Sequence, residues 1–261
     1  MPLPAGYSES SDTAYDRRCV ESIWTYFGQT NTGYRVLPDG RCDIILRFVT
    51  DAGRPISQIS VLIAGPSTTY HMAPIIHGLG FVGIRLRPGF VTSVLGVDLS
   101  MIVDQVLDND ACIKAIPEIA ALHRPAVGIK DLSDRLTRFV ADRRAANGEN
   151  GPSSRSLALL NAIHVSGGQL TVAQLARIHR VDERTVRRDI KTDTGLTPKQ
   201  FAMIIQFHRA MHLLCDHGLD TASAAVEAGY ADQAHMTRVF RQLAGFTPAD
   251  RPEVTLASLK E

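Results

Sequence analysis

The first half of the chain contains short apolar segments separated by turn residues, which is the pattern of β-strands. Residues 42–48 are rich in β-branched and aromatic side chains, and they follow residues 37–40, where Pro, Asp and Gly favour a tight turn. Residues 59–64 form a second such segment, and residues 81–87 alternate between apolar and other side chains, as a half-buried strand requires. The pattern predicts several strands between about residues 19 and 90.

The spacing of the apolar residues changes from two to about 3.6 after residue 90, which indicates helices. Residues 91–95 fit a short helix, and residues 99–107 carry an apolar stripe that Asp98 can cap at its start. A third helix is predicted from a stripe formed by Leu132, Leu136, Phe139 and Val140. The stripe at 99–107 either packs on the sheet or forms a dimer contact, and we favour packing on the sheet.

Small and polar residues dominate positions 145–155, which is the composition of a linker. The residues after it have a helical period throughout. The sequence therefore predicts two domains: a mixed α+β domain of barrel- or sandwich-like strands followed by helices, and an all-α domain. The predicted limits are 1–16 for a flexible N-terminus, 17–144 for the first domain, 145–155 for the linker and 156–261 for the second domain.

Two short helices with a tight turn between them are predicted near residue 180. Thr171 and Gln174 make a capping-box pattern at the start of the first helix. Asp182 can cap the second helix, in which Val186 and Ile190 face inward. The outward positions of the second helix are Arg184, Thr185, Arg187, Arg188 and Lys191. Such a helix fits the major groove of DNA, where Arg contacts guanine and Lys and Thr contact phosphates.

A second unit of the same plan follows. Residues 221–228 form a helix of small residues, and Asp232 can cap a helix over 233–243. The inward residues of that helix are Met236, Val239 and Phe240, which leaves Gln233, His235, Thr237 and Arg238 for DNA. A long apolar-striped helix over 201–214 connects the two units and can hold them at a fixed separation. Successive major grooves on one face of DNA are about 34 Å apart.

Residues 170–251 resemble the DNA-binding domain of the AraC/XylS family of transcription regulators, in which a linker helix joins two helix-turn-helix units. The resemblance is carried by the order and spacing of Gly195-Leu-Thr-Pro198, Gly229-Tyr-Ala-Asp232, Arg238-Val-Phe-Arg241 and Gly245-Phe-Thr-Pro248. It implies base-facing positions for Arg184, Arg187 and Arg188 in the first unit, and for Gln233, Ala234, His235, Thr237 and Arg238 in the second.

The chain departs from the family pattern at a few positions. Ile190 stands where the family usually has Phe, and Ala224 where it usually has Ile, which keeps the core but loosens it. Asp250-Arg251 replaces the usual aromatic-Arg ending. Ala234 has no side chain that can hydrogen-bond a base, so the second unit is expected to read fewer positions than the first.

Residues 19–115 look like the little-characterised N-terminal β domain of some AraC-like regulators. The similar stretches are 36–40, 64–66 and 82–89. Related domains bind small effectors or dimerise, so the resemblance implies a sensor or dimerisation domain. It does not assign the effector or the residues that bind it.

Several residues of the first domain have two interpretations. Trp24 and Tyr34 either line an effector pocket or belong to the core, and the core is the commoner place for such aromatics. His71 and His77 suggest a metal site, but their spacing is no recognised ligand pattern, so a structural or surface role is favoured and no metal or cofactor is predicted. Cys42 is either a redox sensor or a small buried hydrophobe, and burial is favoured.

The composition is that of a soluble globular protein, with 44% hydrophobic and 21% charged residues. The net charge of +1 carries no information about nucleic acid, but residues 177–191 hold six cationic and three acidic side chains. Such a cluster is also typical of a solvated helix face. Four widely spaced cysteines make no disulfide scaffold, and no signal peptide or membrane-spanning segment is found. The cytoplasm is the expected location.

The main interpretation is an effector-sensing transcription regulator that binds double-stranded promoter DNA. A small-molecule effector, RNA polymerase and a second copy of the chain are the other partners considered, and no membrane partner is expected. The alternatives are a metal-dependent small β-barrel enzyme and a helical protein-interaction module. The sequence has no phosphate loop, nucleophile elbow or clustered His/Glu metal motif, so no catalytic residue is predicted. Neither alternative explains two tandem units of one design.

Overall fold

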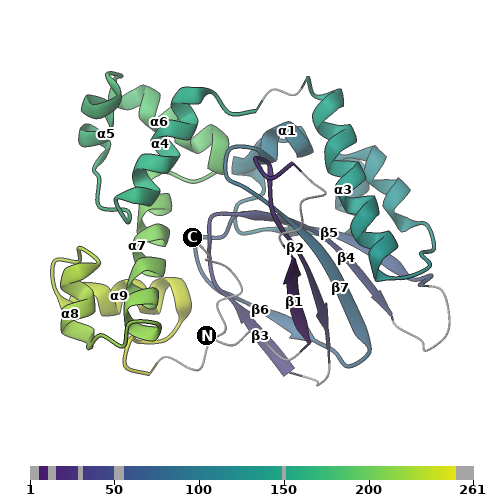
Figure 1. Ribbon diagram of the computed structural model, residues 1–261, viewed down its shortest axis with the longest axis horizontal. Helices are drawn as coiled ribbons and strands as arrows, with labels where there is room; N and C mark the ends of the chain where they lie inside the picture. Colours follow the sequence, from purple (N-terminus) through teal and green to yellow (C-terminus); the bar gives the residue numbers. More distant parts are fainter. Residues whose placement is uncertain (1–5, 11–15, 29–31, 50–55, 149–150, 251–261) are drawn as a thin grey trace.

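The computed structural model describes residues 6–10, 16–28, 32–49, 56–148 and 151–250. These residues build a β-rich domain and a helical domain that lie side by side (Figure 1). Each domain has its own cluster of buried apolar side chains. The predicted two-domain fold class is confirmed.

The larger sheet of the first domain is antiparallel and six-stranded. Its strands in spatial order are β1 (Tyr7–Ser10), β2 (Val20–Phe27), β7 (Leu79–Leu86), β4 (Cys42–Val49), β5 (Ile59–Ala64) and β8 (Val106–Leu107). A second sheet pairs β3 (Thr32–Val36) with β6 (His71–Ile75). Strand β4 alternates as its sequence predicts, because its even-numbered residues are buried and its odd-numbered residues are partly or fully exposed.

Helices cover one face of the six-stranded sheet (Figure 1). They are α1 (Val91–Leu95), the 3-10 helix η1 (Leu99–Met101), α2 (Asn109–Ala115), the 3-10 helix η2 (Pro117–His123) and α3 (Ile129–Ala146). The four apolar residues predicted for the third helical stripe are all buried on α3. They share a core with Ile44 and Ile84, which have no exposed surface. Burial of this apolar surface fixes which face of the sheet the helices cover.

The second domain consists of α4 (Ser154–Val165), α5 (Val172–His179), α6 (Glu183–Thr194), α7 (Pro198–Cys215), α8 (Thr221–Glu227) and α9 (Gln233–Ala244). Helix α7 lies at its centre, with α4, α5 and α6 towards one end and α8 and α9 towards the other (Figure 1). Phe207 and Met211 of α7 are fully buried. None of the described helices is long and apolar enough to span a membrane.

The helix predicted over residues 99–107 is wrong. Only Leu99–Met101 is helical, as η1, and Val106–Leu107 pairs with β5 as the edge strand β8. Asp104 interrupts the helical path with a left-handed φ of 58°. Its carboxylate accepts hydrogen bonds from the backbone N–H and the hydroxyl of Thr68. This long-range contact outweighs the local apolar stripe.

The prediction of a flexible N-terminus over residues 1–16 is wrong for Tyr7–Ser10, which pairs with β2. The ring of Tyr7 stacks on Trp24, with 6.0 Å between centroids. A polar segment becomes a strand here because it pairs with β2 and stacks one aromatic ring on Trp24. Residues 1–5 and 11–15 lie outside the described residues.

The connection between the domains is shorter than the predicted linker 145–155. Helix α3 ends at Ala146 and α4 begins at Ser154, so both ends of the predicted linker are helical. Ser153 starts α4 because its hydroxyl accepts a hydrogen bond from the N–H of Ser156 at 3.0 Å. The Arg251 position of the predicted family ending lies outside the described residues.

Candidate functional site

The first helix-turn-helix unit consists of α5, a short turn and α6. The capping box predicted for Thr171 and Gln174 is present, with both of its reciprocal hydrogen bonds. Arg180 ends α5 in the left-handed conformation with φ 54°. Asp182 caps α6, since its carboxylate accepts a hydrogen bond from the N–H of Thr185 at 2.7 Å. These local bonds fix the tight turn between the two helices.

The exposed face of α6 is a cationic stripe. Val186 and Ile190 are 0% and 1% exposed and anchor the helix. Each residue advances by about 100° around the helix axis. Four cationic side chains therefore lie within roughly one third of the circumference, on the side away from the two anchors. These side chains are Arg184, Arg187, Arg188 and Lys191, and all of them are exposed.

Carboxylates hold part of this stripe in place. Arg187 pairs with Glu183 at 2.6 Å. Arg188 pairs at 3.0 Å with Asp189, whose side chain is only 8% exposed and also pairs with Arg155 of α4 at 2.8 Å. Asp189 therefore links α6 to α4 and orients Arg188 at the surface.

Thr185 is less available than the cations of the stripe. It is half-buried, and its hydroxyl donates to the carboxylate of Asp182 at 2.9 Å. A phosphate contact by this hydroxyl would therefore use its lone pairs, because its proton is already donated.

The second unit consists of α8, a turn and α9. Asp220 caps α8 by accepting hydrogen bonds from the N–H groups of Ala222 and Ser223. Asp232 caps α9 in the same manner as Asp182 caps α6. Phe240 is fully buried and meets Phe207 of α7 edge to face, with 4.8 Å between ring centroids. This aromatic contact fixes α9 on the linker helix.

The outer face of α9 is sparser than that of α6. Gln233 and Arg238 are exposed, and so is Ala234, which offers no hydrogen bond. His235 is half-buried, with its ring 5.3 Å from the ring of Tyr230. The hydroxyl of Thr237 donates to the carbonyl of Gln233 at 2.9 Å. The predicted residues thus occur together on α9, but only Gln233 and Arg238 are both polar and exposed.

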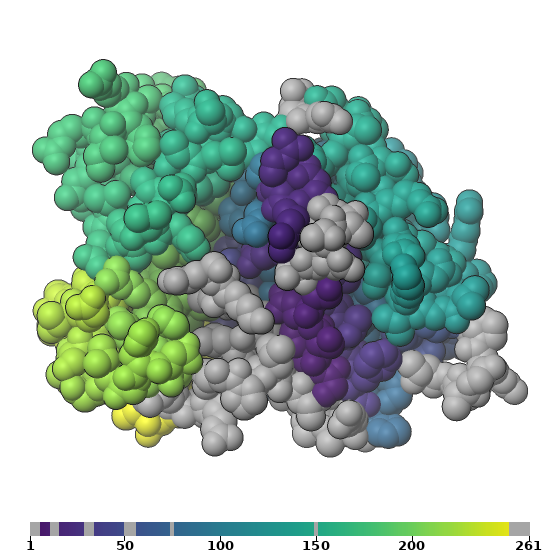
Figure 2. All heavy atoms as spheres, in the orientation of Figure 1, coloured from purple at the N-terminus to yellow at the C-terminus, as the bar shows by residue number. Residues whose placement is uncertain are grey.

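Helix α7 sets the distance between the two units. Its 18 residues span about 27 Å at 1.5 Å per residue, compared with about 34 Å for one turn of DNA. Gln206 of α7 donates to the carbonyl of Ala228 at 3.1 Å and so fastens α8 to this helix. The space-filling view shows the two units one above the other along one edge of the molecule (Figure 2).

The β-rich domain contacts the linker helix and both units. The carbonyl of Pro38 accepts a hydrogen bond from His208 of α7 at 2.6 Å. Thr69 donates to the carbonyl of Gln242 of α9 at 2.9 Å. The N–H of Gly89 donates to the carbonyl of Asp193 at the end of α6, at 2.9 Å. Burial lowers the pKa of His208 to about 4, so its ring is neutral near pH 7 and donates through Nε2.

A cavity of about 450 Å³ lies on the face of the six-stranded sheet that the helices leave uncovered. Residues of both sheets line it, including Trp24 and Tyr34, for which the sequence left two interpretations open. The other aromatic residues of the lining are Tyr7, Tyr26 and Phe81. Gly83 leaves room for this wall, because a Cβ there would come within 2.2 Å of the Trp24 ring.

Charged side chains form one side of the cavity. Arg85 is buried and makes two hydrogen bonds to Asp43, of 3.2 and 3.3 Å. Asp39 and Arg41 line the same side. His71, considered above as a possible metal ligand, lines the cavity and is exposed. Cys42, considered above as a possible redox sensor, is buried in the core.

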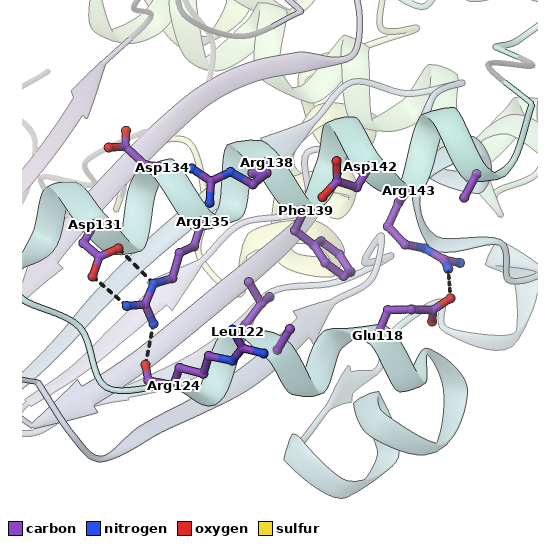
Figure 3. A pocket seen from close by; sticks show the side chains of 12 residues that line it. Glu118, Leu122, Arg124, Asp131, Asp134, Arg135, Arg138, Phe139, Asp142 and Arg143 are labelled. Atoms are coloured by element: carbon purple, nitrogen blue, oxygen red, sulfur yellow. Dashed lines mark hydrogen bonds and ion pairs between the residues drawn. The ribbon is translucent and has the colours of Figure 1, made fainter.

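A second hollow of about 680 Å³ lies at the surface between α3 and η2 (Figure 3). Its cations are Arg124, Arg135, Arg138 and Arg143, and its anions are Glu118, Asp131, Asp134 and Asp142. Arg135 pairs with Asp131 and Arg143 with Glu118, both at 2.6 Å. With balanced charges and paired arginines, this hollow has no evident preference for a charged ligand.

Two family models match parts of the chain, one in each half. Residues 175–251 match the model of a helix-turn-helix domain. Residues 17–108 match a domain of unknown function, DUF6597. Residues 175–251 lie within the region whose sequence resembles the AraC/XylS family.

Curated relatives are similar to a part of the chain. The HTH-type transcriptional activator RhaS of Escherichia fergusonii is 32% identical over 77 residues, which are 30% of this chain and 28% of that protein. RhaS of Escherichia coli O9:H4 is 31% identical over 67 residues, which are 26% and 24% of the two chains. The match therefore spans only about a quarter of the length of these relatives.

Two solved structures are similar at low identity. The C-terminal domain of AraT, a response regulator from Geobacillus stearothermophilus, has 22% identity and a TM-score of 0.36, and the match covers 41% of this chain and 95% of that one. ToxT from Vibrio cholerae has 10% identity and a TM-score of 0.44, with 94% and 97% coverage.

One exposed cation of the helical domain was not among the predicted site residues. Arg241 is exposed on α9, three residues after Arg238 and therefore on the same side of the helix. The signal was available in the Arg238-Val-Phe-Arg241 stretch, because a spacing of three places both arginines on one helical face.

The two positions that depart from the family pattern are buried. Ile190 is 1% and Ala224 is 0% exposed. The smaller side chains are thus buried in the same cluster as the linker helix.

Proposed function

We propose that the protein is a sequence-specific DNA-binding transcription regulator that responds to a small-molecule effector. The observation that carries the proposal is the pair of helix-turn-helix units at the two ends of α7. Two recognition helices joined by one linker helix can enter successive major grooves of one DNA duplex.

In this proposal α6 and α9 are the recognition helices. Arg184 and Arg188 lie four residues apart on the cationic stripe of α6 and are suited to bidentate contact with guanine. Lys191, Arg187 and Thr185 are suited to phosphates. On α9, Gln233 and Arg238 contact bases, and His235 and Thr237 contact the backbone.

The cavity of the β-rich domain is the proposed effector site. Its volume of about 450 Å³ lies in the range typical of ligand sites, roughly 300–1,000 Å³. Its lining is largely apolar and aromatic with a few convergent polar groups, which is the usual make-up of such sites. A regulator of this kind acts where promoter DNA is, so we also propose a cytoplasmic protein. Contact with RNA polymerase and homodimerisation stay predictions.

The test is selection of the purified chain on a random double-stranded DNA library at near-physiological salt. We expect an enriched sequence with two patches about one helical turn apart. Affinity for that sequence should fall steeply with salt, because cations of the protein displace counterions from phosphates. The same selection with fragment 152–261, which keeps the cap of α4 at Ser153, tests the helical domain alone.

A matched control is the double variant Arg184→Ala and Arg188→Ala, whose substitutions lie on the exposed face of α6 and leave the buried face intact. It should fold normally and enrich no sequence at the first patch. Absence of enrichment with the folded full-length chain and with folded fragment 152–261 would contradict the proposed function.

A further inference from the structure

The two helix-turn-helix units can be compared position by position. Their caps, Asp182 and Asp232, stand at equivalent positions. Another matching pair is Ile190 and Phe240, which are 1% and 0% exposed. In this register, a residue of α6 that differs in kind from its counterpart on α9 indicates a feature of the first unit that the second does not share.

Asp189 is such a residue. It is buried on the inner face of α6, and its counterpart on α9 is Val239, which is also buried. An apolar side chain therefore satisfies the packing at this position of the second unit. The first unit buries a carboxylate instead, and removing a carboxylate from water is costly unless it is paired. The partners of Asp189 thus show what its charge is used for.

Two arginines from different helices share the carboxylate of Asp189. Its Oδ1 accepts hydrogen bonds from Nε and Nη2 of Arg188, at 3.1 and 3.0 Å. Its Oδ2 accepts a hydrogen bond from Nε of Arg155, at 2.8 Å. Arg155 belongs to the first turn of α4, which lies beside α6 (Figure 1). One buried carboxylate therefore holds two guanidinium groups next to each other.

The hydrogen bonds to Asp189 use only one edge of each guanidinium group. An arginine has five N–H donors, one on Nε and two on each terminal nitrogen. In Arg188 the carboxylate binds the edge formed by Nε and Nη2, so the edge formed by Nη1 and Nη2 points away from it and is suited to guanine. In Arg155 the carboxylate binds Nε, and the four donors of the terminal nitrogens are suited to a phosphate.

Both arginines reach the surface, whereas the carboxylates beside them do not. The side chains of Arg188 and Arg155 are 62% and 44% exposed. Asp189 is buried, and so is Asp193, the next carboxylate on the inner face of α6. A DNA strand that lies along α6 would therefore meet the two guanidinium groups before it met either carboxylate.

We propose that Arg155 is a DNA phosphate contact outside both helix-turn-helix units, and that Asp189 is the positioning residue that holds it beside Arg188. The inference rests on the proposed function, in which α6 is a recognition helix and Arg188 contacts guanine. Arg155 binds the DNA backbone next to that base. Phosphate contacts set the register of a protein on DNA and base contacts specify the sequence, so Asp189 links the two kinds of contact.

The same arrangement distinguishes the two units. Arg238 is the counterpart of Arg188, and it is followed by Val239 in place of a carboxylate. A flexible side chain must be immobilised on binding, and one that is already held in position loses less entropy. Arg188 is therefore expected to discriminate between bases more strongly than Arg238.

The phosphate contact is tested with Arg155→Ala in the full chain. Fluorescence anisotropy is measured on the selected duplex and on a scrambled one at several salt concentrations. The slope of log affinity against log salt should become shallower by about 1 on both duplexes, and Arg155→Lys, which keeps the charge, should restore it. Arg138→Ala, at an exposed position of α3, is the control and should not alter the slope. An unchanged slope in Arg155→Ala would overturn the phosphate contact.

The positioning role is tested with Asp189→Val, which gives the first unit the residue of the second. The measured quantity is the ratio of affinities for the matched duplex and for a duplex substituted at the base pair read by Arg188. This ratio should fall roughly 2- to 10-fold, which corresponds to immobilising one flexible side chain. Thermal unfolding shows whether the variant is folded, and Asp189→Asn, which keeps the shape of the side chain, replaces it if it is not.

A double variant separates positioning from a merely structural role. In the Arg188→Ala background, Asp189→Val should cause no further change in the ratio, because the residue that it positions is absent. A structural role would lower the affinity by a similar factor in both backgrounds. An unchanged ratio in the folded single variant, or a further fall of the ratio in the double variant, would overturn the role of Asp189.

The outcomes separate this inference from the proposed function. Enrichment of a DNA sequence with no effect of Arg155→Ala would overturn the phosphate contact and leave the proposed function intact. If the chain enriches no sequence, the proposed function fails together with the role of Asp189 in base reading. The salt dependence of Arg155→Ala on a random duplex at low salt then still decides the phosphate contact, because such contacts do not depend on sequence.

Discussion

The two helix-turn-helix units have nearly the same inner faces and very different outer faces. Asp182 and Asp232 cap their second helices in the same way. The inner residues, such as Val186 in α6 and Met236 in α9, are equally buried. Burial and capping therefore give both recognition helices the same local frame.

The outer faces differ in the number and kind of side chains they present. Helix α6 carries four exposed cations. Helix α9 carries two exposed cations, Arg238 and Arg241, and its exposed face also includes Ala234. The inner face determines where a recognition helix lies, and the outer face determines what it reads. We therefore expect the first unit to supply most of the base discrimination and the second to supply mainly backbone contacts.

The largest effect on stability is expected from a change that removes a buried contact of one unit only. Phe240→Ala deletes a fully buried ring between α9 and α7, which should lower the free energy of unfolding by about 3–5 kcal/mol. Urea unfolding followed by circular dichroism measures this loss. Ile190→Val is the milder control in the first unit, at about 1 kcal/mol. A loss below that of the control would show that α9 is not held by this contact.

Arg188→Ala tests the outer face of the first unit. The variant should weaken binding to the selected sequence by roughly 1–3 kcal/mol and relax specificity at one base position. Fluorescence anisotropy with matched and substituted duplexes measures both changes. Arg138→Ala, an exposed arginine on α3, is the control and should leave affinity unchanged. An unaltered affinity of the Arg188 variant would remove this residue from the proposed interface.

Asp220→Ala tests the start of the second unit. The loss of its two hydrogen bonds to backbone N–H groups should destabilise the protein by about 1 kcal/mol. Thr171→Ala removes the corresponding cap from the first unit and should cost a similar amount. A thermal unfolding comparison of the two variants checks the prediction, and a much larger loss for either one would mean that its cap has a role beyond its own helix.

The smallest effect is expected from Arg241→Ala. If Arg241 contacts the phosphate backbone of DNA, it contributes equally to the affinity for every DNA sequence. The variant should therefore bind matched and scrambled DNA more weakly by the same factor. The slope of log affinity against log salt should fall by about 1. Titrations at several salt concentrations measure the slope. A loss confined to the matched sequence would make Arg241 a base contact instead.

The helical domain could be predicted from sequence because its determinants are local. The caps at Thr171, Asp182 and Asp232 and the helical period of the apolar residues lie within a few positions of the elements they define. The N-terminal domain depends on contacts between distant residues. The strand at Val106–Leu107 exists because it pairs with β5, and no local pattern records that pairing.

The cavity could not be predicted from the sequence for the same reason. Its aromatic wall and its charged side come from strands far apart in the chain, so the sequence left Trp24 and Tyr34 with two interpretations. The alternation along its strand predicts which face Arg85 occupies. It does not predict the partner of Arg85, because Asp43 lies 42 positions away in the sequence. Arg241, by contrast, was within reach, because its spacing from Arg238 is a local signal.

The most direct test of the account is a substitution scan of the selected DNA sequence, in which every base pair is changed singly and the affinity of the full chain is measured. The patch read by the first unit is identified as the one whose response flattens in Arg188→Ala. We predict that substitutions in this patch cost roughly 1–3 kcal/mol each, and that those in the other patch cost clearly less. Equal costs in both patches, or larger costs in the patch of the second unit, would contradict the division of roles between α6 and α9.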